Sequence, residues 1–302
     1  MSLEPVRSRV KRTARSARRA WKGTQAGDSL EGNVPLRSGN RAVALDQIRA
    51  MTSWQVISPG RSGTRWFADL LLAVSPCGVV HASRPTLAEI GFLLDQGSIG
   101  PSVAEGAYLQ SRMEWRSRCA LAERAFVDLD CKNSPLAPML LDRYPGMRFL
   151  VMLREPKDFI LSGVNRGYFR TKIPRDWGHL CDSQVSDGLS CDPEMPVAEQ
   201  AIRVALFWNR IASIAHAAVE RAPERTLVIS VRRLFESEEY VGSVLTEANL
   251  PFSGPRLETY SEFGRVKNAN PPTRLSIDPV VIAEASQVAV SGLAEEFLAK
   301  VR

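Results

Sequence analysis

The stretch SPGRSGTRWF at 58–67 combines glycines, hydroxyl side chains and arginines within a few residues. Gly60 and Gly63 allow the backbone to come close to a ligand, and Ser62 and Thr64 offer hydroxyl groups. A helix-like apolar pattern follows at once, and the N–H groups at the start of a helix form an anion-binding nest. These residue types in this order predict a site for a phosphate-like anion.

This stretch differs from the loop that binds nucleoside triphosphates. That loop has the pattern G-x-x-x-x-G-K-[ST], whereas the two glycines here are closer together and no lysine follows the second. Arg61 and Arg65 supply the charge instead, and the planar fork of a guanidinium group suits a tetrahedral oxyanion. No acidic residue that would hold magnesium is evident at a strand end. We expect an anion bound without a metal; the alternative is an ordinary strand–helix turn.

A second segment, LREPKDFILSG at 153–163, has a similar character. It overlaps the end of the apolar run 149–153, so Arg154 stands at the end of a predicted strand and Ser162 on the helix after it. An arginine and a serine that converge there would form a second anion site. The alternative is a surface arginine and a solvated helix serine. Two anion sites on one sheet predict a ligand with two separated phosphates.

Strand-like and helix-like segments alternate along the chain from about residue 41. Strands are expected at 54–58, 125–130, 149–153 and 226–231. A polar helix is expected at 110–124, and a long helix at 197–221 with Trp208 on its apolar stripe. The strands are apolar along their length, which is typical of a parallel sheet with both faces covered. We therefore predict an α/β fold with a central parallel sheet flanked by helices. Ligands bind beyond the carboxyl ends of the strands in such sheets, where both candidate anion sites lie.

The chain is expected to consist of a basic N-terminal appendage, 1–40, and a single domain, 41–302. An insert at 165–197, rich in Gly, Asp, Ser and Pro, is interpreted as a lid over the acceptor site. Eight basic residues and one acidic residue give 1–22 a charge of +7, so the rest of the chain carries −1 of the total of +6. The appendage is either a solvated tail or an amphipathic helix in peripheral contact with an anionic membrane. No aromatic interleaving supports nucleic-acid binding.

The two segments at 58–67 and 153–163 both resemble the donor-binding motifs of sulfotransferases. SPGRSGTRW is similar to their 5′-phosphosulfate loop, P-[KR]-S-G-T-T-W, with Gly60 where proline is common and Arg65 in place of the second threonine. REPKDFILS matches their 3′-phosphate motif, R-x-P-x-D-x-x-x-S, in full. The resemblance covers about 50–170, and more loosely 200–235. It implies a P-loop NTPase-like sulfotransferase fold and the donor 3′-phosphoadenosine 5′-phosphosulfate.

The resemblance also implies a role for each matching residue. Arg61 would bind the phosphosulfate and its bridging oxygen, and Trp66 would pack near the adenine. Arg154 and Ser162 would hold the 3′-phosphate, and Arg65 would add charge near the sulfuryl group. The complete donor-binding set implied in this way is Arg61, Ser62, Gly63, Thr64, Arg65, Trp66, Arg154 and Ser162.

Sulfuryl transfer to an alcohol needs in-line geometry, positive charge on the leaving phosphate and a base for the acceptor proton. Arg61 is the candidate for the charge. The cytosolic branch of the family takes its base from a K-T-H motif, but CKNSP places Lys132 and Ser134 there. His81, in the loop VVHASRP, titrates near neutrality and is our first candidate base. Asp130 is the second.

The sequence thus predicts a cytoplasmic sulfotransferase that acts on a hydroxyl of a small-molecule, carbohydrate or glycolipid acceptor and needs no metal. Five cysteines at irregular spacing indicate a reducing compartment. His179, Cys181 and Cys191 are too few and too unevenly spaced for a zinc site. Arg265 and Lys267 are candidates for a segment that closes over the 3′-phosphate. The alternatives are a P-loop kinase-like phosphotransferase, which would prefer ATP with magnesium, and a non-catalytic nucleotide-binding protein.

Overall fold

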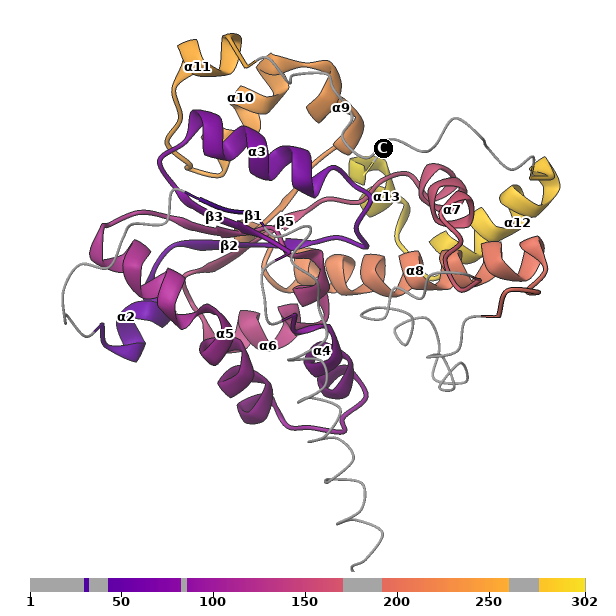
Figure 1. The fold of residues 1–302 in the computed structure, drawn as a ribbon, viewed down its shortest axis with the longest axis horizontal. Helices are drawn as coiled ribbons and strands as arrows, with labels where there is room; N and C mark the ends of the chain where they lie inside the picture. The colour runs from indigo at the N-terminus through magenta and orange to yellow at the C-terminus, as the bar shows by residue number, and fades with distance from the viewer. Residues whose placement is uncertain (1–29, 33–42, 83–85, 171–191, 261–276, 302) are drawn as a thin grey trace, which may run out of the picture.

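The computed structural model describes residues 30–32, 43–82, 86–170, 192–260 and 277–301, drawn in colour in Figure 1. A six-stranded sheet with the order β1-β3-β4-β2-β5-β6 lies at its centre. Five of these strands run parallel, and β1 pairs antiparallel with β3 at one edge. The strands are β1 (Leu30–Gly32), β2 (Ser53–Ile57), β3 (Gly78–His81), β4 (Phe126–Asp128), β5 (Met147–Val151) and β6 (Thr226–Val228). The predicted parallel sheet flanked by helices is confirmed.

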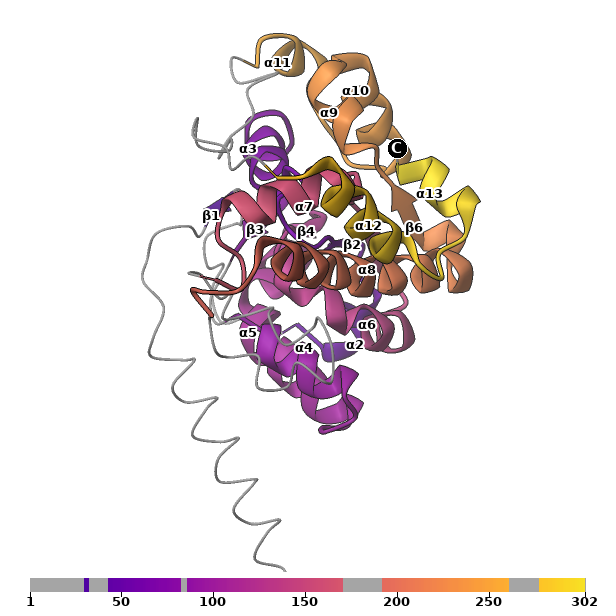
Figure 2. The ribbon, with the colours of Figure 1, turned by 90° about the vertical axis from the view of Figure 1, so that its right-hand side faces the viewer.

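Helices cover both faces of the sheet (Figures 1 and 2). One face carries α3 (Thr64–Val74), α9 (Val231–Glu236), α10 (Glu238–Glu247) and α11 (Gly254–Glu258). The other side carries α4 (Ala88–Asp95), α5 (Pro101–Leu121), α6 (Ala137–Arg143), α7 (Pro156–Asn165), α8 (Val197–Arg221), α12 (Pro279–Val290) and α13 (Glu295–Val301). The remaining elements are α2 (Leu45–Ala50) and the 3-10 turns η1 (Cys131–Leu136) and η4 (Pro223–Arg225).

Strand β5 explains why the apolar runs of this sequence are continuous. Phe149 and Val151 belong to the apolar cluster on the α8 side of the sheet. Leu150 and Met152 belong to the cluster on the α3 side. Successive side chains of a strand point to opposite faces, so a strand covered on both faces needs apolar residues at every position.

Five elements differ from the sequence prediction. Helix α5 begins at Pro101, nine residues before the predicted start at 110. The predicted buried strand at 226–231 corresponds to β6, whose residues are only half-buried because β6 is the edge strand. Two short helices, α9 and α11, follow β6 without having been predicted. Strand β1 falls within the predicted appendage.

Several predicted features lie outside the described residues. These are the basic segment at 1–22, most of the insert at 165–197, and the loop that contains Arg265 and Lys267. His179, Cys181 and Cys191 are outside as well. Among the helices that the structure describes, none combines the length and the apolar character needed to cross a membrane.

Candidate functional site

The loop between β2 and α3 is a tight turn whose shape depends on glycine. Gly60, Arg61 and Gly63 have φ angles of 80°, 57° and 77°. Gly63 is the N-cap of the 11-residue helix α3, and a Cβ atom there would lie 2.7 Å from Cζ of Phe235. The left-handed backbone and the aromatic ring together leave room for glycine only. The amino end of α3 therefore opens onto the loop, where its N–H groups and dipole favour an anion.

Hydroxyl groups hold this loop in shape. The Ser58 N–H donates to Ser134 Oγ at 3.0 Å, and Ser134 Oγ also lies 3.1 Å from the Ser58 carbonyl and 2.6 Å from the Cys131 carbonyl. The Gly60 N–H donates to Ser58 Oγ at 3.1 Å, and Ser62 Oγ donates to the Gly60 carbonyl at 3.0 Å. The side chain of Ser62 therefore helps to maintain the turn.

The two predicted anion-binding segments meet in space. Arg61 Nε donates to Ser162 Oγ at 3.3 Å, although the two residues are 101 positions apart in the chain. Arg154 follows β5, the parallel neighbour of β2, and its side chain lies 3.6 Å from Asp158 on α7. Trp208 of α8 donates its indole N–H to the Arg154 carbonyl at 2.9 Å. The carboxyl ends of the neighbouring strands β2 and β5 thus bring Arg61, Arg154 and Ser162 together on one side of the sheet.

Positive charge is concentrated around Arg61. Burial lowers the pKa of its guanidinium group, and the nearby Arg166 and Arg154 lower it further, while Tyr168 opposes the shift. An arginine remains charged in spite of such a shift because its ordinary pKa is above 12. Half-buried cations that repel one another are stabilised by a bound anion. The electrostatics of the site therefore favour a ligand with more than one negative charge.

Trp66 lies behind the loop rather than at its surface. Its ring is 1% exposed and packs against Phe235 at a centroid distance of 4.8 Å and against Tyr260 at 6.2 Å. The role near the adenine that the resemblance implies for Trp66 stays a prediction. Arg65, on the first turn of α3, lies 3.6 Å from Asp69 one turn along the same helix.

His81, the first candidate base, is close to the anion loop. It ends β3, and its Nε2 lies 3.2 Å from Oγ1 of Thr64, the first residue of α3. The pair joins an imidazole to a hydroxyl at the amino end of the helix that faces the anion site. A base must lie within reach of the proton that it removes, and the role of His81 as that base stays a prediction.

Asp130, the second candidate base, is engaged inside the protein. Its side chain is buried, accepts a hydrogen bond from Arg112 at 3.1 Å, and caps η1 by accepting from the Lys132 N–H. Asp128 accepts from the same arginine at 2.6 Å. Burial raises the pKa of Asp130 to about 6, Arg112 counteracts the shift, and Asp128 adds to it. This arrangement supports η1, the turn from which Ser134 reaches the anion loop.

Sequence reasoning missed three residues that surround the site. Trp208 was assigned only to the apolar stripe of its helix, and Ser134 only to the position of the missing histidine. Arg166 was not considered, although it follows Ser162 by four residues, and residues at this spacing share one face of a helix. That spacing was the available signal for Arg166. The contacts of Ser134 and Trp208 had no signal in the sequence.

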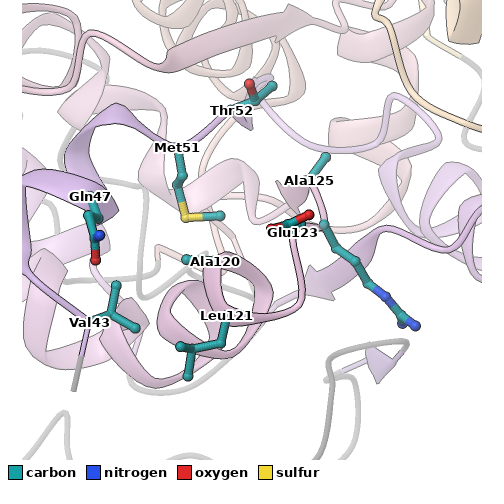
Figure 3. A pocket seen from close by; sticks show the side chains of 9 residues that line it. Val43, Gln47, Met51, Thr52, Ala120, Leu121, Glu123 and Ala125 are labelled. Atoms are coloured by element: carbon teal, nitrogen blue, oxygen red, sulfur yellow. The ribbon is translucent and has the colours of Figure 1, made fainter. Parts of the chain in front are cut away.

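A pocket of about 570 Å³ lies near the amino ends of β2 and β4, whereas the anion loop lies at the carboxyl ends of the strands (Figure 3). Gln47 and Met51 line it from the α2 side, and Ala120 and Leu121 line it from the end of α5. It is separated from the anion loop by the length of the strands. The described residues contain no group of three His, Cys, Asp or Glu side chains suited to a metal ion.

Comparison with known proteins found similar solved structures, two of which are described here. No family model and no curated protein matches the sequence. The sulfotransferase domain from the curacin biosynthetic pathway is 14% identical, with a TM-score of 0.42 over 69% of this chain and 76% of that domain. The sulfotransferase domain from the Synechococcus PCC 7002 olefin synthase is 12% identical, with a TM-score of 0.39 over 80% of this chain and 95% of that domain.

Proposed function

We propose that this protein is a sulfotransferase that uses 3′-phosphoadenosine 5′-phosphosulfate. The observation that carries the proposal is the hydrogen bond from Arg61 to Ser162, because it joins the loop that resembles the phosphosulfate motif to the helix that resembles the 3′-phosphate motif. A ligand that reached both Arg61 and Arg154, which follow two neighbouring strands, would meet positive charge at two points. The doubly phosphorylated adenosine of this donor has that property.

The side chains at the site fit such a donor. The N–H groups at the start of α3 would hold the 5′-phosphate, since Gly63 lets a ligand approach the backbone closely. Arg154 and Ser162 would hold the 3′-phosphate. The bound donor supplies an activated sulfuryl group, and the guanidinium of Arg61 would stabilise the charge that develops on the leaving phosphate.

The proposed transfer of the sulfuryl group needs one base, which takes the proton of the acceptor hydroxyl. The acceptor oxygen forms a bond to sulfur while the bond from sulfur to the bridging phosphate oxygen breaks, and that oxygen keeps the electron pair. The acceptor proton passes to a base, for which we propose His81, because its imidazole lies 3.2 Å from Thr64 at the start of α3.

For the acceptor we propose a hydroxyl on a small molecule, a sugar or a glycolipid. The basic segment at 1–22 would bring a lipid-linked acceptor close, since it carries a charge of +7. Sedimentation with vesicles of anionic lipid tests this part: a chain that stays in the supernatant would refute the membrane contact without affecting the donor site. Acceptor classes are tested by incubating extracts with radiolabelled donor.

Nucleotide titration by calorimetry tests the function itself. We expect adenosine 3′,5′-bisphosphate to bind without magnesium and more tightly than ATP with magnesium. Arg154→Gln should weaken this binding by about 10- to 100-fold, the loss typical of one hydrogen bond to a charged group. Arg203→Gln is the matched control, because Arg203 lies on α8 and pairs with Glu199 at 2.6 Å. A preference for ATP with magnesium, or no heat with the bisphosphate, would refute the proposal.

A further inference from the structure

Two buried carboxylates at the end of β4 share one buried arginine of α5. Arg112 is fully buried, and its guanidinium donates from Nε to Asp128 Oδ2 at 2.6 Å and from Nη2 to Asp130 Oδ2 at 3.1 Å. The ring of Trp115 lies 5.6 Å from Cζ of Arg112 and favours the cation. Burial lowers the pKa of Arg112, but the two carboxylates raise it by more. The arginine therefore stays charged and bridges both side chains with its fork.

The same two carboxylates fix the backbone of η1. Asp128 Oδ1 accepts from the Asp130 N–H at 2.9 Å, and its Oδ2 accepts from Asn133 Nδ2 at 3.0 Å. Asp130 Oδ1 accepts from the Lys132 N–H at 3.2 Å. Asn133 and the adjacent Ser134 are both fully buried. The orientation of the carboxylates thus sets the direction in which η1 leaves β4, and with it the place of Ser134.

The anion loop begins beside η1. Strands β2 and β4 are parallel neighbours with Gln55 opposite Asp128, so the loop after β2 and the turn after β4 lie at the same end of the sheet. Ser134 Oγ accepts from the Ser58 N–H at 3.0 Å. The path from Arg112 to the loop therefore consists of hydrogen bonds between buried groups. A buried group that loses its partner has no water to replace it.

We propose that Arg112 is a positioning residue for the anion loop, because it sets the two carboxylates that orient η1 and, through Ser134, holds Ser58 where the loop can bind the 5′-phosphate. This inference rests on the proposed function, since the 5′-phosphate belongs to the nucleotide named there. Arg112 lies outside both segments that resemble donor-binding motifs, and it acts through η1 rather than by contact with the nucleotide.

The test compares two nucleotides that differ only in the 5′-phosphate, the group that the loop would hold. Calorimetry is carried out with adenosine 3′,5′-bisphosphate and adenosine 3′-monophosphate on the wild-type chain and on Arg112→Lys, which keeps the charge and loses the fork. We expect the bisphosphate to bind about three- to fivefold more weakly, because the ligand then has to restore the orientation of Ser58. The monophosphate should change by less than about twofold.

The matched control is Arg118→Lys. Arg118 lies on the same helix and donates to Glu114 one turn earlier, on the outer side of α5. Such partly exposed pairs contribute little, so both nucleotides should bind to this variant as they bind to the wild-type chain.

A double-variant cycle distinguishes the path through Ser134 from a general loss of stability. The chain with both Arg112→Lys and Ser134→Ala should bind the bisphosphate about as tightly as Ser134→Ala alone, whereas independent effects would multiply. Asn133→Ala leaves both ion pairs of Arg112 in place and removes only the bond from η1 to Asp128. It should show the same selective loss for the bisphosphate, and it decides the matter if Arg112→Lys does not fold.

The outcomes separate this inference from the function on which it rests. Equal losses for both nucleotides, no loss for the bisphosphate, or losses that multiply in the double variant would each overturn the role of Arg112 while the donor site stands. Absence of bisphosphate binding by the wild-type chain would overturn the proposed function and this inference with it.

Discussion

Replacing Ser134 by alanine should release the anion loop from the sheet. Ser134 is fully buried on η1, and its hydroxyl accepts from the Ser58 N–H while lying within hydrogen-bond distance of the Ser58 and Cys131 carbonyls. A hydroxyl has one proton, so it donates to one carbonyl at a time. Ser134→Ala removes the acceptor of a buried N–H and the donor to a buried carbonyl at the entrance of the loop.

The magnitude follows from the groups that lose their partners. A buried polar group left without a hydrogen bond costs about 1–3 kcal/mol, and we expect the free energy of unfolding to fall by about 2 kcal/mol. About half of this lost stabilisation comes from the hydrogen bond that orients Ser58, the residue at which the loop begins. If the ligand has to restore that orientation, its binding weakens by about 1 kcal/mol, or about fivefold in affinity.

Denaturant unfolding and calorimetry with adenosine 3′,5′-bisphosphate measure the two effects separately. Ser213→Ala is the matched control, because its hydroxyl donates to the Asn209 carbonyl one turn earlier in α8 at 2.9 Å. That carbonyl belongs to a helix interior, so the control should change stability by less than about 0.5 kcal/mol. If Ser134→Ala were as stable as Ser213→Ala and bound the nucleotide like wild type, the clamp on the loop would not exist.

Two further predictions concern the loop and the buried carboxylates. Gly63→Ala should lower the free energy of unfolding by at least about 1–2 kcal/mol and weaken nucleotide binding, because it places a Cβ atom on a left-handed residue against Phe235. The control Gly106→Ala, on the exposed side of α5, should instead stabilise the protein by up to about 1 kcal/mol. Similar behaviour of the two variants in thermal melting would contradict the steric argument. For Asp130, whose pKa is raised to about 6 chiefly by burial, the folded state binds the proton more tightly than the unfolded chain, so the stabilising contribution is complete below about pH 4 and is lost as pH rises through 6. Relative to Asp130→Asn, the unfolding free energy of wild type should therefore fall between pH 4 and 6, and a relative rise would show that Arg112 outweighs burial.

The sequence predicted the fold class because its main signals are local. The apolar run at 149–153 is visible in the sequence without knowledge of its partners, since a short run that is apolar at every position is typical of a strand covered on both faces. The helix at 197–221 was predicted with its observed ends because its apolar stripe repeats over several turns. Helix α5 was predicted too short, because its first turns are held by Ala104 and Tyr108, which are buried against distant segments, and such contacts outweigh weak local propensity.

Some features of the candidate site could likewise be predicted from the sequence, and others could not. The glycines of the turn and the arginine and serine of the second segment were recognisable from spacing alone. Their meeting was not, because the bond from Arg61 to Ser162 depends on β2 and β5 being neighbours in the sheet. The identity of the base illustrates the limit. The sequence ranked His81 before Asp130, but only the structure shows that His81 approaches the helix start while Asp130 pairs with a buried arginine.

By itself, then, the sequence determined which short segments form turns, strands or helices, and which carry the positive charge that an anion needs. Those properties depend on backbone geometry and periodicity within about ten residues. The tertiary structure alone determined that Ser134 holds the loop through Ser58 and that Trp208 donates to the strand end at Arg154. These contacts join side chains through the order of strands and the packing of α7 on α8, and strand order depends on the burial of the whole chain rather than on any one segment.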